Sequence, residues 1–177
     1  ATMMNKVFEI IEAKKIFNLK YKQLKILIHR HSYLHAIVKF NNGLTKMLIH
    51  DTNMIIPIFN SLYQKNMNSI TSNNLNINIL NNLELKQVDK KRFPIIKIIG
   101  KLTKNDTLFE TVIVSANDSL VNRFLKNEIK FTDISKYLLK IATLNEFKKY
   151  KNIIPKNVGD IEKLADYVGL KIMTMRV

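Results

Sequence analysis

Residues 34–50 read LHAIVKFNNGLTKMLIH, and this stretch predicts a β-hairpin. Apolar and polar residues alternate on both sides of its central Asn-Asn-Gly, as in two paired strands. Asn-Gly favours a tight two-residue turn, because both central residues of that turn have positive φ. If Asn42–Gly43 forms this loop, Val38 pairs with Met47 on a face that we expect to be buried.

The opposite face of this hairpin is mixed in character. The same register pairs His35 with His50 there, and it places Ile37 and Leu48 on this face. This face is more apolar than a free surface needs, so the pattern favours a partner surface.

A helix and one further strand are predicted before the hairpin. Apolar residues recur at helical spacing from Met4 to Phe17, Thr2 is a suitable N-cap, and Asn18 and Leu19 end the helix. The run Leu24 to His29 is typical of a strand.

The segment that follows the hairpin predicts a linker and then helices. Residues 64–82 are rich in Asn and Ser, with short alternation at Leu75–Ile79 that favours an edge strand. Four helices are expected beyond it, enough for a small bundle. They are the segment from Pro94 to Leu102, one opened by a Ser115–Asp118 capping box and running to Lys126, one capped by Thr132 or Asp133 and running to Leu144, and one from Asp160 to a closing Gly169.

The predicted fold class is therefore α+β. We expect residues 1–63 to be the end of a sheet-and-helix catalytic domain, residues 64–91 a linker, and residues 92–177 a small C-terminal helical bundle.

Composition narrows the function classes. With no cysteine, the chain has no disulfide, thiolate metal site or cysteine nucleophile. No apolar run approaches the ~18–20 residues of a membrane span, and no signal peptide is visible, so a cytoplasmic protein without membrane partners is expected. The net charge is +15, but only four of the 29 basic residues are Arg and the lysines are scattered. A nucleic-acid-binding module is thus an alternative that this pattern disfavours.

One group of residues near the start could carry chemistry. Asn5, Lys6 and Glu9 share one surface of the first helix, whose N-terminal N–H groups favour an anion. A phosphate grip beside a carboxylate suits a metal-assisted reaction on a sugar phosphate. A solvated helix face with a Lys–Glu pair remains the alternative.

Histidines form a second candidate group. Residues 29–35 read HRHSYLH, at a strand end where ligand sites often lie, although the histidines could equally be exposed or structurally satisfied. The four glycines, at positions 43, 100, 159 and 169, form neither a dinucleotide fingerprint nor a phosphate loop.

These stretches resemble the 1-deoxy-D-xylulose-5-phosphate reductoisomerase family. The family motif Ser-Ala-Thr-Met-Met-Asn-Lys, with Glu three residues later, matches Ala1–Lys6 and Glu9. Further similarity covers most of the chain. It is carried by Ile10–Ala13, by His29 with Ser32 and His35, by Asn53–Met54 with Pro57–Ile58, by Arg92–Pro94, by Ser115–Asp118 and by Ile129–Ile134.

The resemblance implies roles for individual residues. Asn5 and Lys6 match the substrate-binding pair, and Glu9 matches one of three carboxylates that hold Mg²⁺ or Mn²⁺. His35 matches a catalytic and substrate-site histidine, and Met54 a pocket methionine. Family members rearrange 1-deoxy-D-xylulose 5-phosphate and reduce it with NADPH to 2-C-methyl-D-erythritol 4-phosphate, for isoprenoid biosynthesis, and a homodimer is implied.

The resemblance also sets expectations about the rest of the enzyme. Because the chain begins at Ala1 within the motif, we expect the NADPH domain and the other two metal carboxylates to lie upstream. The isolated chain should then be inactive and bind no NADPH. A non-catalytic dimerisation or scaffold remnant remains an alternative.

Overall fold

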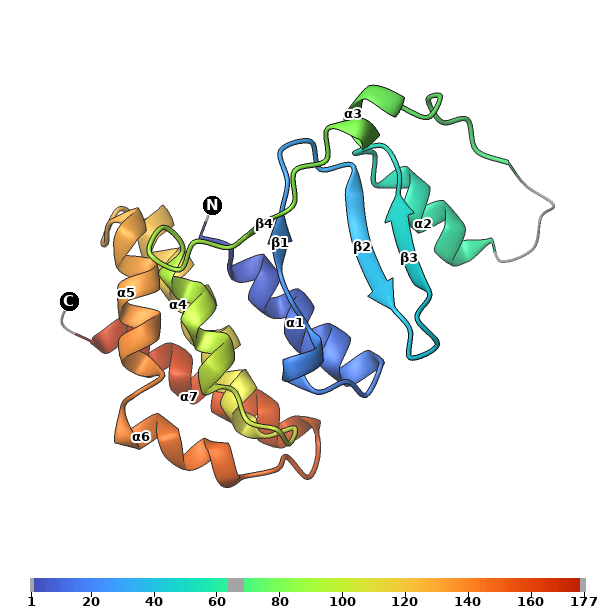
Figure 1. The fold of residues 1–177 in the computed structure, drawn as a ribbon. Coiled ribbons are helices and arrows are strands. Elements are labelled where there is room, and N and C mark those ends of the chain that lie inside the picture. Colours follow the sequence, from blue (N-terminus) through green and yellow to red (C-terminus); the bar gives the residue numbers. More distant parts are fainter. Residues whose placement is uncertain (1, 64–68, 176–177) are drawn as a thin grey trace. The chain divides into compact units, whose positions relative to one another are not determined.

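The computed structural model describes residues 2–63 and 69–175, and it divides the chain into two compact units. The helical unit joins residues 1–26 to residues 89–177, and the hairpin unit is residues 27–88. The helical unit contains α1 (Met4–Ile16), η1 (Tyr21–Gln23), η2 (Pro94–Lys101), α4 (Leu108–Leu125), α5 (Phe131–Ile141), α6 (Asn145–Lys148), η3 (Lys149–Asn152) and α7 (Val158–Thr174). The hairpin unit contains β1 (Leu27–Ile28), β2 (Leu34–Lys39), β3 (Thr45–Ile49), α2 (Ile55–Leu62), α3 (Ile77–Asn81) and β4 (Lys86–Gln87) (Figure 1).

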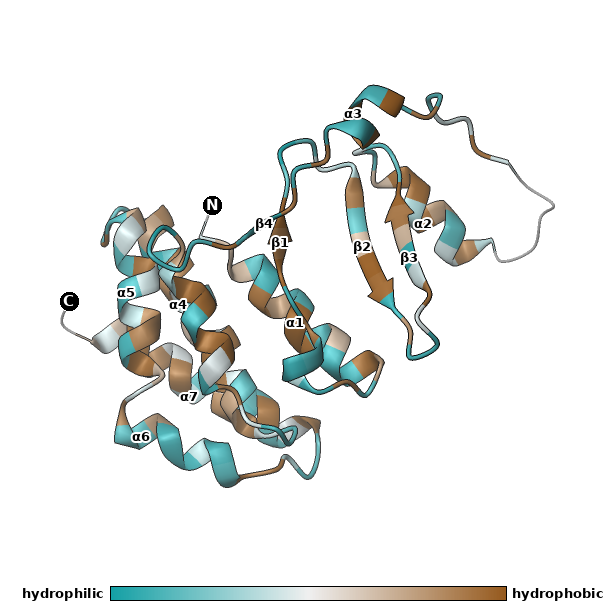
Figure 2. Cartoon of the chain, viewed as in Figure 1, coloured by the Kyte–Doolittle hydropathy of each residue, from teal (hydrophilic) through white to brown (hydrophobic). Residues whose placement is uncertain are grey.

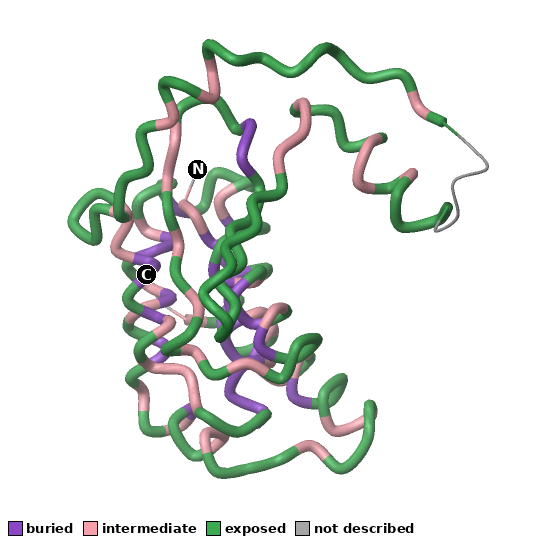
Figure 3. Tube along the Cα trace, turned by 45° about the vertical axis from the view of Figure 1, so that its right-hand side comes forward, coloured by how far each residue is buried: buried purple, intermediate pink, exposed green. Residues whose placement is uncertain are grey.

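The core of the chain lies in the helical unit. Helix α4 packs against both α5 and α7, and α1 packs against η2. Buried positions gather along these helices (Figure 3), and their apolar stripes are visible in Figure 2. The largest fully buried side chains include Phe109, Ile113, Leu138, Phe147 and Val168. The predicted α+β class with a helical bundle is thus confirmed.

Helix α4 starts earlier than predicted. Its N-cap is Thr107, whose hydroxyl accepts from the Phe109 N–H, and Glu110 accepts from the Thr107 N–H at 3.0 Å. The predicted capping box at Ser115–Asp118 was wrong, because those residues lie in the middle of the helix. The residue types at Thr107 and Glu110 and at Ser115 and Asp118 both suit a capping box. Only a start at Thr107 includes the buried Phe109 in the helix.

Two other predicted helix boundaries also moved. The cap predicted for α5 at Thr132 or Asp133 and its predicted end at Leu144 were wrong: the N-cap is Lys130, Asp133 lies in the first turn and accepts from the Lys130 N–H at 3.0 Å, and the helix ends at Ile141. Helix α7 begins after Asn157, with Asp160 inside its first turn, and it continues past Gly169 to Thr174. The predicted end at Gly169 was wrong, because Ile172 extends the buried face beyond it and packing keeps the chain helical.

Replacing two of the glycines by alanine should change the stability of the protein in opposite directions. A Cβ added at Gly169 would meet Ser119 Oγ at an ordinary 3.7 Å, whereas Gly43 has φ +88°. We expect Gly169→Ala to stabilise the protein by ~0.5–1 kcal/mol, because a helix interior favours alanine. Gly43→Ala should destabilise it by ~1–2 kcal/mol through backbone strain. Urea unfolding of both variants measures this; a destabilised Gly169→Ala protein would mean that α4 and α7 pack more closely than described.

The hairpin exists as predicted, but its register is different. Strand β2 pairs antiparallel with β3, with Ile37 opposite Met47 and Lys39 opposite Thr45. The predicted pairing of Val38 with Met47 was wrong by one residue. Gly43 has positive φ whereas Asn42 does not, so the turn is a three-residue loop closed by a Gly43 N–H to Phe40 carbonyl bond.

Both faces of the hairpin are exposed. Val38 and Met47, predicted to be buried, are 49% and 52% exposed. Ile37 and Leu48 on the strands are also exposed, so the hairpin contributes little to the core. The expectation of one buried face therefore failed, because within the described residues of the hairpin unit no layer covers either side.

The segment after the hairpin contains a helix where an edge strand was predicted. Residues Ile77–Asn81 form α3, and Asn76 caps it by accepting from the Ile79 N–H at 3.0 Å. The edge strand predicted at Leu75–Ile79 was wrong, because this asparagine cap starts a helical turn there. A short strand forms later, where β4 pairs with β1.

The two units do not follow the predicted segments 1–63, 64–91 and 92–177. Helix α1 packs within the helical unit, and β4 belongs with β1 in the hairpin unit. Assigning those segments to domains of a longer protein stays a prediction, and residues 64–68 of the proposed linker lie outside the described residues. No helix in residues 2–63 or 69–175 combines the length and apolar character needed to cross a membrane.

Candidate functional site

Helix α1 displays the first candidate group on its exposed face. Met4, Val7 and Ile10 are buried on one side, while Asn5, Lys6 and Glu9 point away from the core. Lys6 Nζ donates to both Glu9 oxygens at 2.8 Å, so the predicted shared surface is confirmed for this pair. Thr2 Oγ1 accepts from the Met4 N–H at 3.3 Å, at the start of the helix.

A partly buried polar network fixes the other end of α1. Lys14 is only 7% exposed, and its Nζ lies 2.5 Å from Asp106 Oδ1. The Tyr21 hydroxyl donates to Glu110 Oε1 at 3.2 Å. Burial, followed by the charge of Glu110, raises the pKa of Tyr21 well above its usual range, so the phenol stays protonated. This network anchors the helix that carries Lys6 and Glu9 to the start of α4.

The ion pair of Lys14 was not predicted from the sequence, although the position of this lysine indicates it. Lys14 was treated as one of several scattered basic residues. It lies three residues after Ile11 and seven after Val7, on the buried stripe of the helix. A lysine at a core position requires a partner for its charge, and that requirement could have predicted an ion pair.

The second candidate group belongs to the hairpin unit. The His35 and His50 rings are stacked, with centroids 3.6 Å apart and an interplanar angle of 4°. The proximity of the two histidines was predicted, although the predicted strand register around them was wrong. Met54 lies at the start of α2 and is 65% exposed. The structure thus brings Lys6 to Glu9 and His35 to His50, with one pair in each unit.

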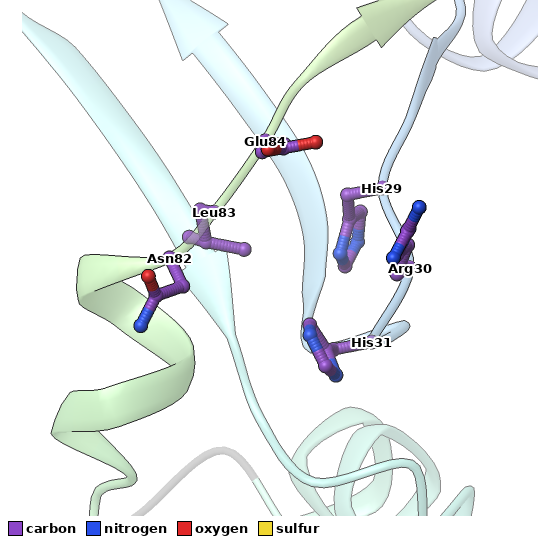
Figure 4. Close-up of a pocket in the computed structure, with 6 residues that line it drawn as sticks. All are labelled: His29, Arg30, His31, Asn82, Leu83 and Glu84. Carbon is purple, nitrogen blue, oxygen red and sulfur yellow. The ribbon is translucent and has the colours of Figure 1, made fainter.

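A small cavity of about 170 Å³ lies beside the first histidines of the HRHSYLH stretch. Figure 4 shows its lining, which comes from two facing segments: His29, Arg30 and His31 on one side and Asn82, Leu83 and Glu84 on the other. His29 Nε2 lies 2.8 Å from the Leu34 carbonyl oxygen, while its Nδ1 is buried and has no hydrogen-bond partner among the described residues. Lys86 forms an ion pair with Glu84 at 2.7 Å and lowers the pKa of that carboxyl.

The described residues offer few side chains that could ligate a metal ion. Among the residues that the structure describes, no group of three or more His, Cys, Asp or Glu side chains is arranged to hold a metal. Glu9 remains as one exposed carboxylate of the hard oxygen type that Mg²⁺ prefers. It would supply a single ligand and needs partners outside these groups.

Comparison with known proteins connects these observations. A family model described as the DXP reductoisomerase C-terminal domain matches residues 50–167. The Pelagibacter ubique 1-deoxy-D-xylulose 5-phosphate reductoisomerase is 63% identical over all 177 residues, and the chain spans 46% of that relative's length.

Solved structures give the same result for the fold. The Zymomonas mobilis 1-deoxy-D-xylulose 5-phosphate reductoisomerase in complex with NADPH aligns with a TM-score of 0.81 at 26% identity, covering 98% of this chain and 44% of that one. A DOX-P reductoisomerase in complex with NADPH, fosmidomycin and magnesium has a TM-score of 0.85 at 24% identity, over 98% and 43% of the two chains, and shows the fold. By its matched residues and its fold, this chain belongs to the DXP reductoisomerase family, in the part that contains the C-terminal domain.

Proposed function

We propose that the chain works as part of a 1-deoxy-D-xylulose 5-phosphate reductoisomerase. Such an enzyme uses NADPH and Mg²⁺ or Mn²⁺ to rearrange and reduce its substrate to 2-C-methyl-D-erythritol 4-phosphate, in cytoplasmic isoprenoid biosynthesis. The observation that carries the proposal is the 63% identity to the Pelagibacter ubique relative across the whole chain. The exposed Lys6–Glu9 pair on α1 supplies chemistry that suits it.

Lys6 and Asn5 are proposed to hold the substrate phosphate. Both side chains are exposed at the start of α1, where the helix dipole favours an anion. The pair between Lys6 and Glu9 is exposed and three residues apart, an arrangement worth only ~0.2–0.5 kcal/mol. Breaking this ion pair therefore costs little free energy, so that Lys6 would be available to bind the substrate phosphate and Glu9 to ligate the metal.

Glu9 is the residue of this chain that would ligate the metal. Bound Mg²⁺ or Mn²⁺ would supply Lewis-acid polarisation of the substrate oxygens. The Lys14–Asp106 ion pair anchors α1, the helix that carries Glu9, so the carboxylate is positioned by a rigid element. His35 and Met54 are proposed to line the substrate site from the hairpin unit. NADPH would bind residues outside these 177, since no glycine-rich fingerprint occurs in the sequence.

The hairpin is proposed as the surface of a homodimer. Its two strands expose Ile37, Val38, Met47 and Leu48, and Phe40 and Leu44 at the loop are exposed as well. Apolar side chains exposed on both faces of a strand pair are unusual on a monomer and typical of an interface. A second copy of the hairpin is the partner we propose.

A charge at Leu48 tests the dimer. Leu48 is 57% exposed, and burying a lysine there in an interface would leave its charge unpaired. We expect Leu48→Lys to raise the dimer dissociation constant by about 100-fold, or ~2.7 kcal/mol. Leu125→Lys is the matched control, because Leu125 is 69% exposed in the helical unit and should leave the dimer intact. Sedimentation equilibrium measures both; a Leu48→Lys protein that dimerises as tightly as its parent would exclude the hairpin from the interface.

The proposed activity can be tested in a chimeric enzyme. The test enzyme is the Pelagibacter ubique relative with its matching region replaced by these 177 residues. It should oxidise NADPH when 1-deoxy-D-xylulose 5-phosphate and Mg²⁺ are present. The 177-residue polypeptide alone is the control, and we propose that it neither binds NADPH nor turns over, because hydride transfer needs a held nicotinamide.

A further inference from the structure

The backbone at His35 is irregular. Leu34 lies opposite Ile49 and Ala36 lies opposite Leu48, so β2 advances two residues while β3 advances one. His35 is the extra residue, and the ladder has a bulge at its position. Bulges turn a side chain out of the regular alternation of a strand, and they are enriched beside active sites. The direction of the His35 side chain is thus set by the backbone.

The His50 ring supports the His35 ring from one side. The two rings are stacked at a centroid distance of 3.6 Å. His50 is itself held, because its N–H donates to the carbonyl of buried Tyr33 at 3.2 Å and its Nδ1 lies 2.5 Å from the Asp51 carbonyl oxygen. A stacked aromatic partner fixed by two main-chain contacts limits rotation of the His35 ring.

The same neighbour determines which His35 nitrogen carries the proton. Nε2 of His35 lies 3.1 Å from the His50 carbonyl oxygen. A carbonyl oxygen only accepts, so Nε2 must donate and carry the hydrogen. In the neutral ring, Nδ1 then has the lone pair and acts as a hydrogen-bond acceptor. A substrate hydroxyl can donate to such a nitrogen, whereas a phosphate oxygen cannot.

We infer that His50 is a positioning residue for His35, and that His35 presents a bare Nδ1 to a hydroxyl group of the substrate. The inference rests on the proposed function, in which His35 lines the substrate site. His50 acts through its ring, which stacks, and through its carbonyl group, which selects the tautomer. It does not itself contact the substrate.

Two variants test the contribution of the His50 ring, since both keep the main-chain carbonyl. His50→Ala removes the stacked ring and keeps the main-chain carbonyl, while His50→Phe keeps a flat ring. In the test enzyme, His50→Ala should raise KM for 1-deoxy-D-xylulose 5-phosphate about three- to tenfold and change kcat less than about twofold, since stacking contributes to ground-state orientation. His50→Phe should restore KM to within about twofold of the parent. Tyr63→Ala, at an exposed aromatic residue of the same unit, is the control and should leave both constants unchanged.

Nitrogen NMR of labelled histidine provides a readout that does not depend on activity. In the 177-residue polypeptide, the neutral His35 ring should show a protonated Nε2 and a bare Nδ1, and His50→Ala should mix the two tautomers, because a ring without its stacked partner can turn away from the carbonyl. A parent spectrum with protonated Nδ1 would overturn the inference, as would a His50→Ala protein with an unchanged spectrum and unchanged KM. If the unmodified test enzyme has no turnover, the proposed function fails, and the NMR spectra alone decide whether His50 positions His35.

Discussion

Turnover of the test enzyme should fall at least about 100-fold when Glu9 is replaced by glutamine. The change keeps the size of the side chain and removes the anionic oxygen that a hard divalent ion requires. Glu9 is exposed and its one described partner is Lys6, so the substitution should leave folding unaffected. NADPH oxidation as a function of Mn²⁺ concentration measures the loss, which excess Mn²⁺ should restore only in part.

Glu12→Gln is the matched control for this experiment. Glu12 lies three residues further along the same helix and is also exposed, but it lies outside the group formed by Asn5, Lys6 and Glu9. Its turnover should match the parent. Lys6→Ala should instead raise KM for the substrate more than it lowers kcat, because it removes a phosphate contact. Normal turnover of Glu9→Gln would remove this residue from the metal site.

Stability should depend most strongly on one buried arginine. Arg123 is 8% exposed; its Nε donates to Glu128 at 3.0 Å, and its Nη1 donates to the carbonyls of Ile172 and Met175 at 3.0 and 3.1 Å. The two bonds from Nη1 join the end of α4 to the C-terminal end of α7. Arg123→Met should lower the free energy of unfolding by ~2–4 kcal/mol, because charge-assisted bonds are lost and the carbonyl groups keep no donor.

Arg92→Met gives the comparison, since Arg92 is an exposed arginine of the same unit. It should change the free energy of unfolding by less than ~0.5 kcal/mol. Urea denaturation of both variants gives the two values. Equal destabilisation would mean that loss of positive charge, rather than the contacts of Arg123, accounts for the effect.

Patterns with a local physical cause were predictable from the sequence. The helix at residues 4–16, the two arms of the hairpin and the Pro94 helix start follow from apolar spacing and from turn or cap chemistry. The Lys6–Glu9 contact follows from helix geometry alone. The family resemblance was carried by the motif at Ala1–Lys6 with Glu9 and by further stretches along the chain, and the comparisons confirmed it.

Features that depend on tertiary contacts were not predictable in this way. The two-residue turn was preferred because Asn-Gly fits it, but the strands close through a three-residue loop with Gly43 alone at positive φ. Gly169 looked like a helix end, yet packing of Val168 and Ile172 carries the helix through it. The exposure of Val38 and Met47 could not be deduced, because alternation indicates two faces without indicating what covers them.

The proposed function is tested most directly by the unmodified test enzyme, in which the 177 residues replace the matching region of the Pelagibacter ubique relative. The rate of NADPH oxidation that depends on 1-deoxy-D-xylulose 5-phosphate and Mg²⁺ should lie within about tenfold of the parent relative, because the exchanged region is 63% identical. A chimera that folds and binds NADPH, yet gives no such oxidation, would contradict the proposal that these residues complete a reductoisomerase active site.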